Sequence, residues 1–357
     1  MKLPQIQNWF VVQWHITDKC NFKCKFCYIP HEYKTGMKRR ELSYDDIVKI
    51  IDDICELAKN FNLMVRINFT GGDPLLREDF FDIARYAKSK GIFVSILGNP
   101  ITDEDIVREL KKLRVFRYQI SIDGLKDTHE YFRGKNSWDL AIKSLKLLGE
   151  FGITRVVLTT VSRINYHEVP KLIEYLYKNN LVEIYDFSGI VPIGEGGRYY
   201  EECLKPEEFR ELLFKVYFTY KKLYEEGYKP HIGTKDPLWA LMYHDLGILR
   251  PEVYKLVRVR HGCSIGWFGL VIDVDGKVYG CRRLPEEVGD VTVQKIGEIF
   301  FTSPKLKNMR EVKRIDGCKD CLLWGVCRGC RAIAWAISKG NYFARDPRCW
   351  KVVDNLL

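Results

Sequence analysis

The sequence lacks a long hydrophobic run. No stretch of its 357 residues approaches the roughly 18 consecutive apolar residues that a membrane-spanning helix needs. The first residues, MKLPQIQNWFVVQWHI, do not combine a basic region, an apolar stretch and a small-residue cleavage site, as a secretory signal does. We therefore expect no membrane contact and a cytoplasmic location.

The sequence also lacks a segment dominated by charge of one sign. Its 57 lysines and arginines outnumber its 47 aspartates and glutamates, giving a net charge of +10, but the two signs are mixed along the chain. Basic residues do not gather with aromatic ones in any segment, which argues against nucleic acid as a partner. We expect most charges to form a solvated surface; the alternative is attraction for an acidic partner.

Cysteine, by contrast, is abundant, and its 12 residues are clustered. In the cytosol disulfides are rare, and clustered thiols more often bind metal or carry out redox chemistry. Three cysteines lie between residues 20 and 27, and seven lie between residues 263 and 349. Of the other two, Cys55 is expected to be a small core residue on an apolar helix face, and Cys203 is assigned no role.

Strand-like and helix-like segments alternate over the first two-thirds of the chain. Strands are predicted at residues 10–16, 64–70, 92–98, 116–123, 153–161 and 183–190. Helices are predicted at residues 43–60, 77–90, 103–112, 137–150, 166–179 and 207–227, the first capped by Ser43 with Asp46 three residues later. Six β–α units predict a parallel sheet with right-handed crossovers, either open and doubly wound or a partial barrel. In both, ligands bind at the carboxyl ends of the strands.

This alternation stops near residue 230. The seven later cysteines lie among short elements and glycine-rich turns. The region has too little apolar periodicity to fold well without something that cross-links it. We therefore predict two domains, residues 1–230 and residues 231–357, the second a small cysteine-rich module.

The first cysteine cluster, Cys20-x₃-Cys24-x₂-Cys27, lies on a loop shortly after the first strand. Three thiolates within eight residues can surround one metal centre, and a set of three leaves a coordination position open, which is typical of a catalytic site. The alternative is a zinc site of three cysteines and one histidine, completed by His15 or His31.

This spacing after a first strand resembles the signature of the radical S-adenosylmethionine (SAM) superfamily, and the resemblance covers essentially the whole chain. It implies that the three thiolates hold a [4Fe–4S] cluster whose open iron is chelated by SAM. Reductive cleavage of SAM would then give methionine and a 5′-deoxyadenosyl radical that abstracts a hydrogen atom. The fold it implies is a partial (β/α)₆ TIM-like barrel followed by a small C-terminal Cys-rich Fe–S domain.

Further motifs follow successive strands in the order of that family. Thr70-Gly71-Gly72-Asp73-Pro74 resembles its Gly-Gly-Glu-Pro motif, which binds the SAM amino group, with Asp in place of Glu; the alternative is a tight turn. The segment around Ser121 resembles the part that contacts the ribose, and the matching arginine pairs with the SAM carboxylate. The residues that the resemblance assigns to SAM are Phe26, Tyr28, Gly71, Gly72, Asp73, Asn99, Ser121, Asp123 and Arg133.

The seven later cysteines resemble a SPASM domain, which carries two auxiliary [4Fe–4S] clusters and makes three clusters in all. The interleaved assignment usual in that family gives one cluster to Cys263, Cys281 and Cys330 and the other to Cys318, Cys321, Cys327 and Cys349. His261 is a candidate for the fourth ligand of the first. Cys327 and Cys330 are one residue closer than in many SPASM domains, although the Asp-Pro-x-Cys ending at Cys349 fits several branches. The alternative is a structural zinc site of Cys318, Cys321, Cys327 and Cys330.

The resemblance implies an oxidoreductase that abstracts a hydrogen atom from a peptide or protein substrate, supplied with electrons by a ferredoxin or flavodoxin. A second reading is maturation of haem or of a metal cofactor such as the tungsten or molybdenum cofactor, for which a basic chain would suit propionates or phosphates. A third is a non-enzymatic Fe–S electron carrier or a zinc-stabilised module. Sulfatase maturation is disfavoured, because Arg282 and Arg283 stand where those enzymes carry an acidic base. The sequence identifies no further catalytic residue.

Overall fold

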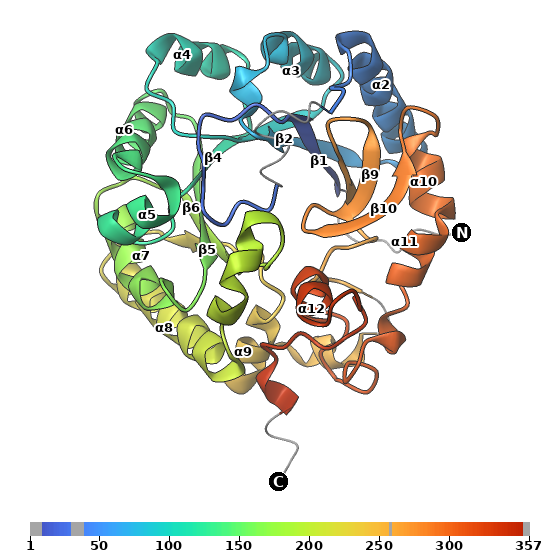
Figure 1. Cartoon of the computed structure of the whole chain (residues 1–357). Coiled ribbons are helices and arrows are strands. Elements are labelled where there is room, and N and C mark those ends of the chain that lie inside the picture. The colour runs from blue at the N-terminus through green and yellow to red at the C-terminus, as the bar shows by residue number, and fades with distance from the viewer. Residues whose placement is uncertain (1–8, 30–38, 257–258, 353–357) are drawn as a thin grey trace.

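The computed structural model describes residues 9–29, 39–256 and 259–352 (Figure 1). Ten strands form one sheet in the order β10-β9-β8-β1-β2-β3-β4-β5-β6-β7. The neighbours from β8 through β1 to β7 are parallel, and β8, β9 and β10 are joined by antiparallel pairing. The sheet curves around a central space with helices on its outside (Figure 1). Since β7 and β10 are its two ends, the barrel is partial, as predicted.

The elements have the following bounds. The strands are β1 (Trp9–Thr17), β2 (Met64–Gly71), β3 (Phe93–Leu97), β4 (Arg117–Ser121), β5 (Arg155–Val161), β6 (Ile184–Gly189), β7 (His231–Ile232), β8 (Gly269–Ile272), β9 (Lys277–Cys281) and β10 (Leu284–Asp290). The helices are α2 (Tyr44–Phe61), α3 (Phe80–Ser89), α4 (Glu104–Lys112), α5 (Lys126–Arg133), α6 (Ser137–Glu150), α7 (Val169–Lys178), α8 (Pro206–Glu225), α9 (Trp239–Asp245), α10 (Ile296–Thr302), α11 (Pro304–Met309) and α12 (Arg331–Ile337).

The six β–α units predicted from periodicity are confirmed. The largest difference in a boundary is three residues, as at the start of α3, which begins at Phe80 rather than at residue 77. Ser43 caps α2 by accepting a hydrogen bond from the Asp46 amide (3.2 Å). Helix α5 was not predicted, because only His129 and Phe132 of its eight residues are buried and its apolar periodicity is weak.

Apolar and polar side chains alternate along the strands, so the apolar core and the barrel interior lie on opposite faces of the sheet. In β2, Val65, Ile67 and Phe69 face the helices and are 5% exposed or less. Arg66 and Asn68, which alternate with them, face a cavity inside the barrel. Because successive side chains of a strand point to opposite faces, the core lies between sheet and helices, while the interior is lined by polar side chains.

The C-terminal region joins this framework. β8 pairs in parallel with β1, placing Gly269 opposite Val11. Leu270 on β8, Ile299 on α10 and Leu306 on α11 belong to the same core cluster as the barrel helices. The sheet and the core thus run across the predicted boundary at residue 230, and the division into two domains there stays a prediction. In the described part of the chain, no helix has the length and apolar character needed to cross a membrane.

Candidate functional site

The three cysteines that follow β1 lie on a loop at the carboxyl end of the sheet. The loop is held to α5 by a hydrogen bond from the Lys25 amide to the Phe132 carbonyl (2.9 Å). Cys20, Cys24 and Cys27 line one cavity of about 140 Å³. They therefore lie at the end of a parallel sheet where ligands bind.

Most of the residues predicted to hold the first cluster and SAM surround this cavity. Those that line it are Cys20, Cys24, Phe26, Cys27, Tyr28, Gly71, Gly72, Asn99, Ser121 and Arg133. Asp73 and Asp123 are buried at 6% and 0% exposure and are not among its lining residues. The structure thus gathers ten of the twelve predicted residues around one cavity.

Gly71 and Gly72 bring the loop after β2 against the cysteine loop. Gly71 has a φ of +126°, and a Cβ on Gly72 would lie 2.0 Å from the Lys19 carbonyl oxygen. The Gly72 amide donates to the Thr17 carbonyl (2.8 Å), which fixes this close approach. Glycine is required here by backbone conformation and by lack of space, so the turn forms one wall of the cavity.

Asp73 has a local structural partner. Its side chain accepts a hydrogen bond from the Leu75 amide (3.3 Å), capping a short 3₁₀ helix at Pro74–Leu76. Burial raises the pKa of Asp73, and hydrogen bonds from Leu75 and Asn99 act against that increase. Asn99 itself donates to Asn21 Oδ1 (2.5 Å) and lies 3.6 Å from the Cys20 sulfur. A direct contact between Asp73 and the SAM amino group stays a prediction.

Arg133 connects the cysteine loop to β4. It forms an ion pair with the fully buried Asp123, and its Nη1 lies 3.5 Å from the Cys24 sulfur. Its guanidinium also lies over the Phe26 ring, 5.6 Å from the centroid. Asp123 accepts a further bond from the Thr160 amide (2.8 Å), so its carboxylate orients Arg133 rather than facing the cavity. N–H groups close to thiolate sulfurs, here from Asn99 and Arg133, stabilise the thiolate form and tune a cluster.

Tyr28 lies between the cysteine loop and β8. Its hydroxyl lies 3.2 Å from His15 Nε2, and His15 Nδ1 lies 3.5 Å from Asp273. Arg282 lies over the Tyr28 ring, 5.2 Å from the centroid, and burial raises the pKa of Tyr28. His15 is therefore engaged at both ring nitrogens rather than directed at the thiols. The other histidine of the zinc alternative, at position 31, lies outside the described residues.

The later cysteines divide between two cavities in the sets that the resemblance implied. Cys263, Cys281 and Cys330 line a cavity of about 430 Å³ inside the barrel. His261 is exposed and does not line it, so the proposed fourth ligand is not brought to these thiols. Arg283 reaches this cavity and also the first one, donating to Ser188 Oγ at 3.1 Å.

The second set lies further from the barrel. Cys318, Cys321, Cys327 and Cys349 line a cavity of about 740 Å³ in the C-terminal region. Burial raises the pKa of Cys349 to about 11 and that of Cys327 well above its ordinary value. Thiols of this kind bind metal with release of their protons, so these four ligands couple cluster binding to pH.

The sets of thiols fit the predicted iron–sulfur clusters. Among the described residues, no three His, Cys, Asp or Glu side chains converge on a point that a single metal ion could occupy. A four-iron cluster requires no such point, because each thiolate binds a different iron. A set of three thiols leaves one iron open for SAM, whereas a set of four closes a cluster. Cys55 packs partly buried against the core, as predicted, and Cys203 packs beside a small cluster around Phe26.

The sequence reasoning missed the polar and basic side chains inside the barrel. Gln13, Arg66, Asn68, Arg117 and Gln119 line the cavity that holds the Cys263 set. A signal was present, because these residues occupy alternate positions of strands whose other residues are apolar. Alternation alone does not say which face of the sheet is solvated and which lines a closed barrel.

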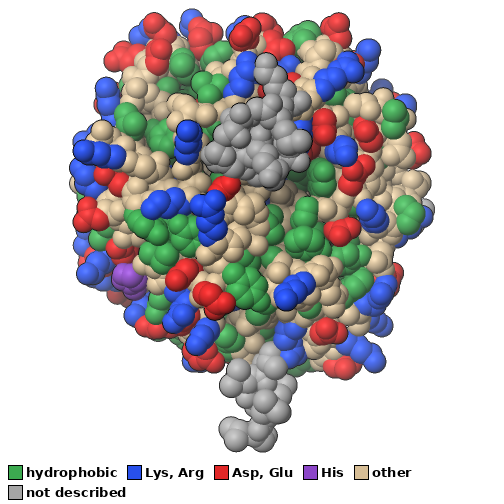
Figure 2. Space-filling view, in the orientation of Figure 1, with side chains coloured by type: hydrophobic (Ala, Val, Ile, Leu, Met, Phe, Trp, Pro, Cys, Tyr) green, Lys and Arg blue, Asp and Glu red, His purple; other side chains and the backbone are tan. Residues whose placement is uncertain are grey.

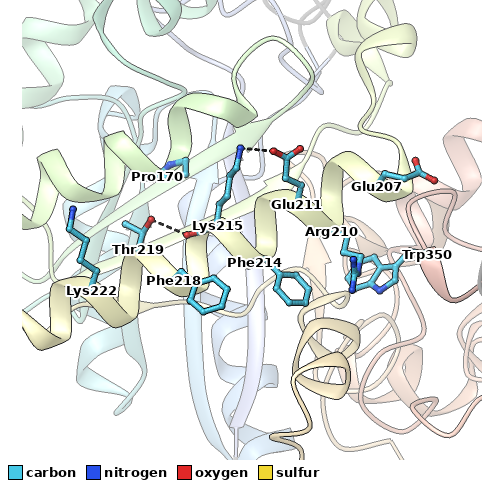
Figure 3. A pocket seen from close by; sticks show the side chains of 10 residues that line it. All are labelled: Pro170, Glu207, Arg210, Glu211, Phe214, Lys215, Phe218, Thr219, Lys222 and Trp350. Carbon is cyan, nitrogen blue, oxygen red and sulfur yellow. Dashed lines mark hydrogen bonds and ion pairs between the residues drawn. The ribbon is translucent and has the colours of Figure 1, made fainter.

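A further groove, of about 760 Å³, lies along the outer face of α8 (Figure 3). Its walls come from α8, Pro170 of α7 and Trp350, and it contains no cysteine. Lys215 pairs with Glu211 (2.5 Å) within the same helix (Figure 3). The groove is therefore a surface feature of a helix, separate from the thiol sites.

Comparison with known proteins agrees with this arrangement. The family model of the radical SAM superfamily matches residues 14–176, and the model of an iron–sulfur cluster-binding domain, SPASM, matches residues 263–322. An Fe-coproporphyrin III synthase of Methanosarcina barkeri is 28% identical over 95% of this chain and 87% of its own length. An AdoMet-dependent heme synthase of the same organism is 27% identical over 95% of both chains.

Solved structures show the same fold. Native anSMEcpe with bound AdoMet has a TM-score of 0.74 at 18% identity, covering 97% of this chain and 95% of that one. SuiB of Streptococcus suis, bound to S-adenosylmethionine, has a TM-score of 0.74 at 17% identity, covering 96% of this chain and 77% of that one. The chain therefore belongs to the radical SAM superfamily and carries a SPASM iron–sulfur domain in its C-terminal part.

Proposed function

We propose that this protein is a radical SAM enzyme that decarboxylates side chains of an iron tetrapyrrole during haem maturation. The relatives that match almost the whole chain are named for haem and coproporphyrin synthesis. They favour the cofactor-maturation alternative over the peptide or protein substrate that the sequence analysis placed first. The observation in the structure that carries the proposal is the charge of the cavity inside the barrel.

That cavity is strongly basic. The charged side chains that line it are Arg66, Arg117, Arg282 and Arg283 on the positive side and Asp186 on the negative side, together with Lys235, whose pKa is lowered well below its ordinary value by burial and by Arg282 and Arg283. The outer surface is different, because acidic and basic side chains are interspersed over the face seen in Figure 2. A buried excess of guanidinium groups suits a ligand with several carboxylates, such as a tetrapyrrole with propionate or acetate side chains.

The same cavity adjoins both sets of thiols that the chemistry needs. Leu97, Gln119, Arg282 and Arg283 line it together with the cavity of Cys20, Cys24 and Cys27, so the two spaces share a wall. Cys263, Cys281 and Cys330 line the same cavity. A substrate bound here would lie beside both the SAM site and an auxiliary site.

The proposed reaction sets the requirements for these groups. When bound at Cys20, Cys24 and Cys27, the cluster and SAM supply the radical chemistry that removes one hydrogen atom. Conversion of a propionate into a vinyl group releases that hydrogen atom, carbon dioxide and one electron. An electron acceptor is therefore needed, and Cys263, Cys281 and Cys330 would hold a group of that kind on the same cavity. Three clusters in all are part of this proposal.

The chain's own residues position the substrate. Arg283 is fixed by bonds to Ser188 Oγ (3.1 Å) and the Gly189 carbonyl (3.2 Å), and it lies between the two cavities. Arg282 is held over the Tyr28 ring. Two guanidinium groups fixed at this junction can orient a reacting carboxylate beside the SAM site.

The electron donor is also a proposal. The rim of the cavity around Cys318, Cys321, Cys327 and Cys349 includes basic residues, namely Lys313, Arg314, Lys319, Arg345 and Lys351. We expect an acidic ferredoxin or flavodoxin to dock there, since complementary charge steers association at low ionic strength.

The test is turnover of cluster-loaded protein under anaerobic conditions. SAM, a reductant and either iron coproporphyrin III or iron uroporphyrin III are added, and 5′-deoxyadenosine and decarboxylated porphyrin are quantified. We expect the two products to form together with one of these substrates. Formation of 5′-deoxyadenosine with no decarboxylated product from either would reject the tetrapyrrole substrate, and a matching assay with peptides would then test the peptide reading.

A further inference from the structure

A row of polar side chains without partners crosses four strands inside the barrel. The row consists of Gln13, Asn68, Ser95 and Arg117, which are register partners on β1, β2, β3 and β4 in turn. Each carries a buried polar atom without a hydrogen-bond partner among the described residues, as does Arg66, two residues before Asn68 on β2. These five atoms make up a large share of the twelve such atoms in the described chain.

Buried polar groups in proteins are almost always satisfied, so a cluster of exceptions requires an explanation. Here four of them belong to register partners on neighbouring strands, and the fifth, on Arg66, lies two residues away on the same face of β2. Three of these atoms, on Gln13, Arg66 and Arg117, are N–H donors, whereas Asn68 Oδ1 is an acceptor and the Ser95 hydroxyl can act as either. Unpaired polar atoms beside a cavity are expected where a ligand supplies the missing partners.

Arg66 and Arg117 give this part of the barrel its charge. Neither side chain makes a hydrogen bond or an ion pair within the described chain, although the charge of Asp186 acts to raise the pKa of Arg117. Burial and the neighbouring Arg117 lower the pKa of Arg66 to about 10. Two buried guanidinium groups without a bonded anion are costly in the ligand-free protein, and an anion bound by both would lower that cost.

Aromatic side chains form the floor beneath these arginines. The rings of Trp9, Phe93 and Phe116 contact one another, with centroids 5.0 to 6.4 Å apart. The Arg66 guanidinium lies about 6 Å from the centroids of both Trp9 and Phe116. The rings contact the Arg66 side chain while its Nε has no hydrogen-bond partner among the described residues, so that N–H remains available to an acceptor.

Asp186, the acidic residue that lines the cavity, acts on Arg117 through its charge but is bonded to other groups. Asp186 accepts hydrogen bonds from the amides of Phe187 (2.9 Å) and Lys235 (3.3 Å), and no bond joins it to either arginine within the described residues. Burial raises the pKa of Asp186 to about 6. The positive charge at the floor is therefore available to a ligand.

We infer that Arg66 and Arg117 form a carboxylate anchor at the floor of the barrel, which holds a non-reacting carboxylate of the substrate while another carboxylate lies beside the SAM site. This inference rests on the proposed function for the identity of the substrate. Arg66 lies four residues before Thr70, which lines the SAM cavity, so the two levels are roughly 13 Å apart at about 3.3 Å per residue. A ligand that spans them is a large, multiply carboxylated molecule such as a tetrapyrrole.

The experiment compares wild type with the double variant Arg66→Met/Arg117→Met at matched iron and sulfide content. Arg108→Met, an exposed arginine on α4, is the control. Binding of iron coproporphyrin III and of its methyl ester is measured by absorbance titration. We expect wild type and R108M to bind the acid tightly, and the double variant to bind it about 10- to 100-fold more weakly, as for lost charged hydrogen bonds. Affinity for the ester should be the same in all three.

Two further measurements distinguish an anchoring role of Arg66 and Arg117 from a purely structural one. Ligand-free double variant should unfold at the same or a higher urea concentration than wild type, because two unpaired buried charges have been removed. Malonate, compared with chloride at equal ionic strength, should raise the melting temperature of wild type and not that of the double variant. Phosphate in a parallel arm distinguishes a site for planar carboxylates from a general anion site.

The outcomes distinguish the two proposals. If the double variant binds iron coproporphyrin III as tightly as wild type does, the anchor is wrong and the proposed function stands. If wild type binds no tetrapyrrole but malonate still stabilises it through Arg66 and Arg117, the proposed function is wrong and the anion site stands. If malonate stabilises wild type and the double variant equally, or stabilises neither, the anchor is overturned.

Discussion

The barrel and the C-terminal segment 310–352 provide hydrogen-bond partners for their backbone N–H and C=O groups in different ways. In the barrel, parallel strands pair over long registers, and alternate side chains pack against helices. The segment has one helix of seven residues, α12, among turns and short 3₁₀ elements. Its arginine side chains donate to backbone carbonyls within the segment and in the loop before β8: Arg331 donates to Ala344, Arg328 to Cys263 and Arg310 to Gly266, at 2.6 to 2.7 Å.

The difference shows how an irregular region can be ordered. Every buried carbonyl needs a donor, and a chain without extended helices or strands must supply donors from side chains. Arginine has five N–H groups and can reach several carbonyls at once. The sequence analysis expected this region to need cross-links from metal. The structure adds a second kind of cross-link, in which buried arginines connect loops that are far apart in sequence.

The largest effects are expected from removing a thiol in each region. Cys24→Ala should abolish 5′-deoxyadenosine formation and change the urea unfolding midpoint little, because the barrel strands are held by their own backbone pairing and the substitution leaves the backbone of the loop in place. Cys327→Ala, which removes a buried thiol of the four-cysteine set, should raise hydrogen exchange throughout residues 310–352. Hydrogen exchange and anaerobic turnover are measured on both proteins.

Cys55→Ala is the control, since that thiol is assigned to no cluster. Protein freed of iron by a chelator is the second control, and in it wild type and C327A should exchange alike. If C24A and C327A raised hydrogen exchange in the same segments, the two regions would not differ in how they depend on their thiols.

The next effect concerns the junction of the two regions. Arg348 is 1% exposed and pairs with Asp236 (2.7 Å) and Asp346 (2.8 Å). Arg348→Met leaves two buried carboxylates without their cation, so we expect a loss of about 3–5 kcal/mol in the free energy of unfolding, measured by urea titration. Arg348→Lys should not restore it, because one ammonium group cannot match the geometry of both pairs.

Arg210→Met is the matched control for this junction. Arg210 pairs with Asp245 at 3.2 Å, but its side chain is half exposed. An exposed pair contributes about 0–1 kcal/mol, so the variant should unfold almost as wild type does. Equal losses from R210M and R348M would show that burial of the pair is not what joins the regions.

Sequence reasoning succeeded where the signal is local. The six β–α units follow from periodicity, and the cysteine spacing identifies the loop after β1, because these three thiols are close in sequence. It could not foresee that β8 pairs with β1, since pairing of distant segments leaves no periodic trace. The basic floor was missed for a related reason. Arg66 and Arg117 become neighbours only through the register of three strands.

A smaller effect tests the close packing on the barrel side. A Cβ on Gly72 would lie 2.0 Å from the Lys19 carbonyl, so Gly72→Ala must displace the cysteine loop. We expect a loss of about 1–3 kcal/mol in stability and weaker SAM binding, measured by urea titration and calorimetry. Gly197→Ala is the control, because nothing lies within 4 Å of its Cβ position. SAM binding that is unchanged in G72A would separate this turn from the cofactor site.

The smallest expected effect is a pH dependence of the free energy of unfolding that arises from a histidine of the barrel. His129 on α5 is 1% exposed, its Nδ1 accepts a bond from the Asp123 amide (3.1 Å), and burial together with Arg133 lowers its pKa to about 3. The unfolded chain binds a proton at His129 below its ordinary pKa of about 6.5, and the folded chain does not, so stability falls as the pH is lowered from there.

His129→Gln removes this contribution. Between pH 6.5 and 5.5 wild type should lose about 1 kcal/mol more stability than the variant, measured by urea titration at each pH. His167→Gln, at an exposed histidine after β5, should show the same change in the free energy of unfolding with pH as wild type. A variant H129Q with the same slope as wild type would mean that the folded barrel accepts a proton at this imidazole. The interior around Asp123 and Arg133 would then be less tightly closed to water than the hydrogen-bonded sheet implies, and closer in character to the loops of the C-terminal segment.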